Sequence, residues 1–283
     1  MKVANKKQKI FMGLKVVIVL AVVIASVIII KDEVMWQFGI GDYSSDATGQ
    51  DSCNVAGVIL HGRLVTYISP ADYDVDGNLL VDQTASEDIV YSIKEAENDD
   101  AIEAIILEID SYGGSPVGAE EIANALKNTK KPTVALIREG GVSAGYWAAT
   151  GADRIVASKN SDVGGIGVTG SYLDYSGQNE KEGIIYNQLS SGKFKDAGDP
   201  DKALTQEERN LFMRDVNILH QNFIKIVAQN RNLDIKKVEA LADGSSMLGE
   251  MALKNGLIDQ IGGELEVIEY IESQIIAQPQ ICW

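Results

Sequence analysis

The sequence predicts an α/β domain with a mostly parallel sheet and flanking helices, preceded by one transmembrane helix. Two observations predict the domain. Short β-branched segments alternate with helical segments, and one strand segment is apolar along nearly its whole length. Such alternation favours a parallel sheet with right-handed crossovers, and an apolar strand is expected where both sheet faces are covered. A third observation, an uncharged apolar run near the N-terminus, predicts the transmembrane helix.

The N-terminal segment has the pattern of a membrane anchor. Five lysines precede the apolar run 16–30, and the apolar segment counted from Ile10 would be about 31 Å long as a helix, enough to cross a bilayer. Asp32 and Glu33 follow, so the positive-inside rule places the N-terminus in the cytoplasm and the following domain outside. A cleavable signal peptide is the alternative, but no small-x-small cleavage site follows Ala25. We therefore expect residues 1–31 to be an uncleaved anchor.

Charge and cysteine content limit the ligands of the outer domain. Residues 1–31 hold six of the 25 basic residues and none of the 41 acidic ones, which leaves a net charge of −22 on the remainder. Such a surface repels nucleic acid and anionic headgroups. Cys53 and Cys282 have no metal-ligand spacing, and whether they form a disulfide stays open. We expect neither a metal nor a cofactor.

The remaining elements follow in order. Residues 32–54 are rich in Gly, Ser and Asp and are typical of a flexible tether, so the folded domain should span residues 55–283. Strands are predicted at 55–60, 104–109, 133–137 and 155–157, and helices at 86–97, 116–128, 205–230, 238–242, 250–255 and 265–276. The helix at 205–230 opens with a capping box, in which Thr205 caps and Glu208 reaches back.

Ser143 is the candidate nucleophile. It lies among small residues (Gly140, Gly141, Ala144, Gly145) after a strand and before a helical run. A serine in such a turn is exposed near a helix N-terminus and leaves room for a carbonyl to approach. The structural alternative is a glycine-rich turn that only packs a small helix.

A second glycine turn follows the strand 104–109. Gly113 and Gly114 can direct backbone N–H groups toward the sheet's carboxyl edge, where open α/β sheets bind their ligands. An oxyanion hole needs such donors. The structural alternative is a helix-entry turn with Pro116 at the first helical position.

The sequence has only two histidines, which limits the candidates for the general base. His61 ends the first strand, and His220 lies within a long helix beside Leu219 and Phe223, so a Ser-His-Asp triad is poorly supported. Lysine can replace histidine when an apolar pocket keeps the amine neutral. Lys193 and Lys195 flank an aromatic residue in the segment 190–200, which by composition alone is a solvated basic loop.

Together these motifs resemble those of the signal peptide peptidase A family, short single-domain type, over residues 55–271. Three motifs match in order: Ser-Tyr-Gly-Gly at 111–114, Gly-Val-Ser-Ala-Gly-Tyr at 141–146, and Ser-Gly-Lys-Phe-Lys-Asp at 191–196. The resemblance implies a Clp-protease or crotonase-like fold and a Ser-Lys dyad. It places the nucleophile at Ser143, the general base at Lys195, with Lys193 as the alternate base, and the oxyanion hole at Gly113, Gly114 and Ala144.

Two positions depart from the family pattern. Tyr112 stands where the family usually has proline, which would alter the rigidity of the oxyanion turn. Gly165 stands where the family commonly has a serine that hydrogen-bonds the catalytic lysine. Without that hydroxyl, Thr169, Ser171 or a water would have to orient Lys195.

The resemblance also implies a function. A membrane-anchored serine endopeptidase would degrade residual signal peptides and other apolar peptides at the outer face of the membrane. Its subunits would form a homo-oligomeric ring in which neighbours complete each active site. The alternatives are a stomatin-partner-specific Ser-Lys membrane protease, a crotonase-type enzyme that acts on acyl thioesters, and a catalytically weakened member acting as a scaffold.

Overall fold

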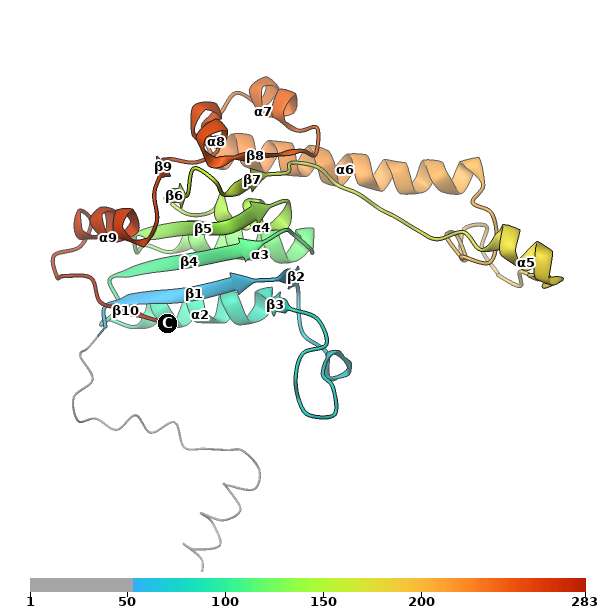
Figure 1. The fold of residues 1–283 in the computed structure, drawn as a ribbon, viewed down its shortest axis with the longest axis horizontal. Coiled ribbons are helices and arrows are strands. Elements are labelled where there is room, and N and C mark those ends of the chain that lie inside the picture. The colour runs from blue at the N-terminus through green and yellow to red at the C-terminus, as the bar shows by residue number, and fades with distance from the viewer. Residues whose placement is uncertain (1–52) are drawn as a thin grey trace, which may run out of the picture. The chain divides into compact units, whose positions relative to one another are not determined.

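The computed structural model describes residues 53–283 (Figure 1). The predicted anchor and nearly all of the predicted tether lie outside the described residues. Between residues 53 and 283, no helix is both long and apolar enough to span a bilayer. The described residues belong to one compact unit.

The sheet is mostly parallel, as predicted. Its main path runs β10–β1–β4–β5–β6–β9, and every neighbouring pair along this path is parallel. Two further strands extend it, because β7 pairs parallel with β5 and β8 pairs antiparallel with β7. The bounds are β1 Val55–His61, β4 Ala104–Ser111, β5 Thr133–Val142, β6 Arg154–Ala157, β7 Asp162–Gly164, β8 Ser246–Leu248, β9 Gln260–Ile261 and β10 Ile281–Cys282.

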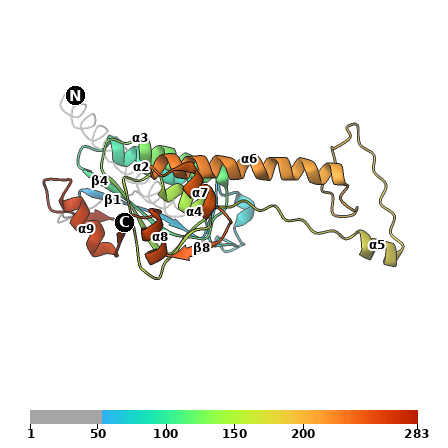
Figure 2. The ribbon, with the colours of Figure 1, turned by 90° about the horizontal axis from the view of Figure 1, so that it is seen from above.

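Helices cover both faces of the sheet, which explains the apolar run in β4. Its residues Ile105, Leu107 and Ile109 belong to the larger core cluster with α2, α3 and α4, whereas Ile106 packs with the smaller cluster around α9 (Figures 1 and 2). Successive side chains of a strand point to opposite faces, so both sets must be apolar. These helices are α2 Ser86–Asn98, α3 Pro116–Asn128, α4 Ala144–Ala149 and α9 Glu264–Glu272.

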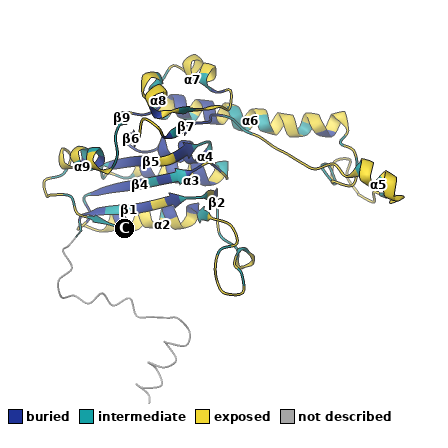
Figure 3. Ribbon diagram, viewed as in Figure 1, coloured by how far each residue is buried: buried dark blue, intermediate teal, exposed yellow. Residues whose placement is uncertain are grey.

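The predicted helix at 205–230 is confirmed as α6, Gln206–Asn230, and it opens with the predicted capping box. Its C-terminal half packs into the core, where Phe223 and Val227 are buried. Its N-terminal half runs out from the domain, and α5, Ser176–Glu182, lies beyond the end of this half; both are largely exposed (Figures 1 and 3). We call residues 171–218 the arm. Two short helices, α7 Ile235–Leu241 and α8 Gly249–Asn255, follow α6.

Two local features hold the ends of the strands. A small parallel sheet of β2, Arg63–Val65, and β3, Gln83–Ala85, precedes α2, with a 3₁₀ turn at Pro70–Asp72 between them. Cys53 and Cys282 form the disulfide that the sequence left open, with 5.7 Å between their Cα atoms. It links the residues just before β1 to β10, the short strand at this edge of the sheet.

Candidate active site

Ser143 lies in a sharp turn between β5 and α4. Its backbone has φ 54° and ψ −123°, a region that residues other than glycine rarely adopt and that costs about 1–3 kcal/mol. Two hydrogen bonds fix the turn: the Ser143 N–H donates to the Gly164 carbonyl at 2.8 Å, and the Trp147 N–H donates to the Ser143 carbonyl at 2.9 Å. The surrounding structure therefore holds the serine in a strained conformation at the helix N-terminus.

The glycine turn after β4 lies against this serine. Gly113 and Gly114 have φ values of 117° and 149°. A Cβ at Gly113 would lie 2.8 Å from the Ser143 Cβ and 3.1 Å from its Oγ. Leu64 of β2 holds the turn, since its N–H donates to the Gly113 carbonyl at 3.0 Å and its carbonyl accepts from the Ser115 N–H at 2.8 Å.

Two backbone donors remain available beside Ser143. Among the described residues, nothing accepts a hydrogen bond from the Gly114 N–H or from the Ala144 N–H, and both residues line the same cleft as Ser143. The Gly113 N–H differs, because it donates to the Ser111 Oγ at 3.3 Å. Gly114 and Ala144 can therefore serve as oxyanion donors, while Gly113 provides space for the serine.

The cleft at Ser143 has a volume of about 760 Å³ and an aromatic wall. Trp147 stacks on Phe223 with ring centroids 4.9 Å apart, and Leu219 and His220 of α6 lie beside them in the wall. Within residues 53–283, neither Trp147 Nε1 nor His220 Nε2 has a hydrogen-bond partner, and both atoms are buried. Sequence reasoning missed Trp147, Leu219 and Phe223 as cleft residues, although the i, i+4 spacing of Leu219 and Phe223 indicated a shared helix face.

Gly165 lies at the cleft wall in a conformation that suits glycine. Its φ is 60°, and a Cβ there would lie 2.4 Å from Val142 Cγ1 and 3.3 Å from the Ser143 nitrogen. The serine that the family commonly has would therefore be strained in this backbone. Of the residues considered for orienting the lysine, Thr169 lines the cleft and Ser171 does not.

The structure does not bring Lys195 to Ser143 within one chain. Lys195 is exposed on the arm and is not among the residues that line the cleft. Within the described part of the chain, no carboxylate lies within ion-pair distance of its amine, whereas Lys193 pairs with Glu207 at 2.7 Å.

The other polar candidates have structural contacts. His61 Nε2 lies 3.0 Å from Glu108 Oε1, outside the Ser143 cleft. The Tyr146 hydroxyl is buried and donates to the Leu257 carbonyl at 2.8 Å, and burial raises the pKa of this phenol far above its ordinary value. Tyr146 therefore stays protonated and packs α4 into the domain.

Comparison with known proteins identifies the family of this chain. The model of peptidase family S49 matches residues 125–276, more than half of the chain, and this stretch contains Ser143 and Lys195. A protein of Methanocaldococcus jannaschii named "Putative protease" is 33% identical over 67% of this chain and 62% of its own length. One of Enterococcus faecium named "Putative signal peptide peptidase SppA" is 32% identical over 68% of this chain and 57% of its own length.

The chain thus spans about three fifths of the length of these curated relatives. Among solved structures, a ClpP1 mutant from Listeria monocytogenes is similar with a TM-score of 0.48 and 12% identity, covering 74% of this chain and 92% of that chain.

Proposed function

The chain belongs to peptidase family S49, and on this basis we propose that it is a serine peptidase with Ser143 as the nucleophile and Lys195 as the general base. One observation carries the proposal. Ser143 is held in a strained strand-to-helix turn between two N–H groups, those of Gly114 and Ala144, for which the described residues offer no acceptor. This arrangement suits the attack of a hydroxyl on a carbonyl whose oxygen becomes negatively charged.

The chemistry is acyl transfer to serine. Neutral Lys195 takes the Ser143 hydroxyl proton as the oxygen attacks a peptide carbonyl, and the two N–H groups hold the tetrahedral oxyanion. The lysine then gives the proton to the leaving amine, which breaks the peptide bond and leaves an acyl-enzyme. A water activated by the same amine releases the acyl group. The apolar wall formed by Trp147 and Phe223 would accept an apolar part of the substrate.

We further propose that Lys195 acts on Ser143 of a neighbouring copy of this chain. Two features support this: the arm, which carries Lys195, runs out from the domain (Figure 1) and contributes no residue to the cleft, and exposed apolar side chains lie along the arm. Among them are Ile185, Leu189 and Phe212. Docking against an apolar cleft would desolvate the amine and favour its neutral form.

Subunit mixing tests both parts of this proposal. Ser143→Ala and Lys195→Ala proteins should each lose activity by about 10⁴-fold or more. After the two inactive variants are dissociated together and reassembled, about a quarter of wild-type activity should return, because random pairing joins an intact serine to an intact lysine at one site in four. Single variants that retain wild-type activity would contradict the dyad. A mixture that stays inactive would place the base within the same chain.

The substrates we propose are residual signal peptides and other apolar peptides at the outer face of a membrane, with residues 10–30 as the anchor. A stomatin-partner-specific membrane protease would share every motif, and comparing the substrates that accumulate in wild-type and Ser143→Ala cells separates the two. A weakened, scaffold-like member is supported by Gly165, and it would leave Ser143 unlabelled by a fluorophosphonate probe. Alkaline extraction of membranes tests the anchor, since an anchored chain stays in the pellet.

A further inference from the structure

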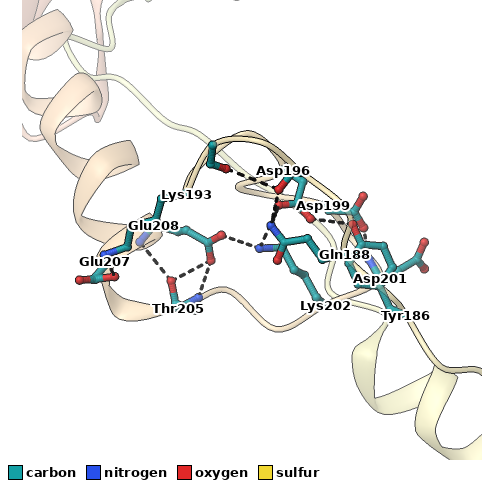
Figure 4. Close-up of polar contacts among 12 residues, drawn as sticks. Tyr186, Gln188, Lys193, Asp196, Asp199, Asp201, Lys202, Thr205, Glu207 and Glu208 are labelled. Atoms are coloured by element: carbon teal, nitrogen blue, oxygen red, sulfur yellow. Dashed lines mark hydrogen bonds and ion pairs between the residues drawn. The ribbon is translucent and has the colours of Figure 1, made fainter.

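A network of ion pairs and hydrogen bonds holds together the part of the arm that carries Lys195 (Figure 4). It joins Asp196, the residue after Lys195, to Lys202 and then to Glu208 in the first turn of α6. No residue of the arm belongs to the core clusters, and this network connects the lysine segment to a buried carboxylate of the helix, next to the exposed pair Lys193–Glu207.

The Glu208 end of the network is buried. Its side chain is only 4% exposed, and one carboxylate oxygen accepts from Lys202 Nζ at 2.5 Å. The other oxygen accepts from the Thr205 N–H at 2.9 Å and from the Thr205 hydroxyl at 2.8 Å. The capping box of α6 thus also anchors Lys202.

The Asp196 end faces inward from the lysine segment. Asp196 lies 3.9 Å from Lys202 Nζ, and both side chains are 18% exposed. Its carboxylate also accepts from the Tyr186 hydroxyl at 2.7 Å and from the Gln188 amide. Donors from two directions therefore fix the orientation of this carboxylate.

Exposure changes along the turn at 193–198. Lys195 is exposed, whereas Asp196 to Asp199 are half-buried, and Gly198 packs against the ring of Phe212 of α6. Because its contacts hold the Asp196 side chain, the backbone beside the exposed Lys195 is restrained. A hydrogen-bonded network whose buried members have partners makes the segment more rigid.

We propose that Asp196, Lys202 and Glu208, with Tyr186, are positioning residues that present Lys195 to its nucleophile. The inference rests on the proposed role of Lys195 as the general base. It requires that the network set the position of the amine, and with it the rate of the chemical step, while substrate binding depends on the separate cleft at Ser143.

Two adjacent carboxylates provide a matched experiment. Glu208→Gln removes the charge that holds Lys202, but glutamine can still accept in the capping box. Glu207→Gln removes one charge from the same helix turn, and it breaks only the exposed pair with Lys193, in which both side chains are 63% exposed. The full-length variants are assayed for kcat and KM on an apolar peptide, using only protein that elutes at the wild-type assembly size.

The expected result is a fall in kcat of about tenfold to 10²-fold for Glu208→Gln, with KM within about twofold, because small misplacements of a catalytic group cost this much. Glu207→Gln should keep the wild-type kcat. Lys202→Met should lose kcat in the same way, and Lys202→Arg should recover most of it, since arginine restores the charge between the two carboxylates.

Three results would overturn the positioning role. The first is a wild-type kcat in both Glu208→Gln and Lys202→Met. The second is an equal loss in Glu207→Gln and Glu208→Gln. The third is a loss that is seen in the unfractionated protein and disappears in the fraction of wild-type assembly size. Lys195→Ala separates this inference from the proposed function. If Lys195→Ala stays active, the base assignment fails, whereas if it is inactive while Lys202→Met is fully active, only the positioning role fails.

Discussion

At the scale of the residue, the site depends on glycines that bring backbone close to Ser143. Gly113 lies so near that a methyl group would meet the serine Cβ at 2.8 Å, and its φ of 117° suits no other residue. Gly114 exposes its N–H because Leu64 holds the residues on either side of it. The oxyanion site that we propose is therefore built from backbone N–H groups, whose positions depend on these glycine conformations.

Gly113→Ala should lower kcat/KM by about 10²-fold or more, because the added methyl must displace Ser143 or the oxyanion turn. Gly177→Ala is the control, since a Cβ at Gly177 of α5 would meet no atom within 4 Å. We expect Gly177→Ala to keep its activity, and both proteins should keep the wild-type circular dichroism spectrum. An active Gly113→Ala enzyme would show that the turn is not part of the site.

Gly165→Ser should lower activity, although it restores the residue that the family commonly has. The backbone at φ 60° and the Cγ1 of Val142 at 2.4 Å both oppose the new side chain, at a cost of about 1–3 kcal/mol. Adding Val142→Ala removes the close methyl and should recover part of the loss in melting temperature and kcat. A gain in activity from Gly165→Ser alone would mean that the turn can shift at little cost.

The sequence predicted the glycine turns and Ser143 because their residue types imply backbone conformations. It could not predict that Trp147, His220 and Phe223 share the cleft wall. Those contacts depend on how α4 and α6 cross, and a helical period indicates an apolar face without identifying what covers it.

At the scale of the element, α6 is divided between two roles. Phe223 and Val227 anchor its C-terminal half in the core, while Glu208 at its N-terminus holds the lysine segment of the arm. The capping box and helical period predicted this helix with nearly correct bounds. That it runs out from the domain could not be predicted, because its exposed apolar side chains, such as Phe212 and Ile218, resemble a core-facing stripe.

Acid should loosen the arm before the rest of the domain unfolds. Hydrogen bonds from Lys202 and Thr205 lower the pKa of Glu208 to about 2 from its ordinary 4.5. A lowered carboxyl pKa stabilises the folded state above pH 4.5, and this contribution is lost as the pH falls from 4.5 through 2. Hydrogen exchange in residues 193–210, corrected for intrinsic rates, should rise over this range.

The two carboxylate variants check this assignment. Glu208→Gln should exchange faster at pH 6 and show a smaller further change on acidification, whereas Glu207→Gln should behave like the wild type. If the arm of Glu208→Gln has the wild-type pH dependence, Glu208 is not the group that responds.

At the scale of the whole molecule, the disulfide joins residues 229 positions apart and fixes β10 beside β1. A Cys53→Ser/Cys282→Ser variant should lose about 3–5 kcal/mol of unfolding free energy, because its unfolded chain regains the freedom that the cross-link removes. Thermal melts with and without reductant measure this. Reductant should lower the melting temperature of the wild type toward that of the variant, and it should leave the variant unchanged. Equal melting temperatures in all four conditions would contradict the role of the bond.

The order of elements along the chain predicted the parallel sheet, since alternation of strand and helix restricts the topology strongly. The same order could not place Lys195 relative to Ser143. In our proposal, the arm that carries the lysine docks on a neighbouring copy of this chain. The order of elements in one chain does not indicate how two copies pack against each other.

The most direct test of the Ser143–Lys195 assignment is labelling of the full chain with a fluorophosphonate probe, followed by mapping of the modified residue. We predict that the probe modifies one residue, Ser143, and that Lys195→Ala loses this labelling. Labelling at another serine, or undiminished labelling of Ser143 in Lys195→Ala, would contradict it.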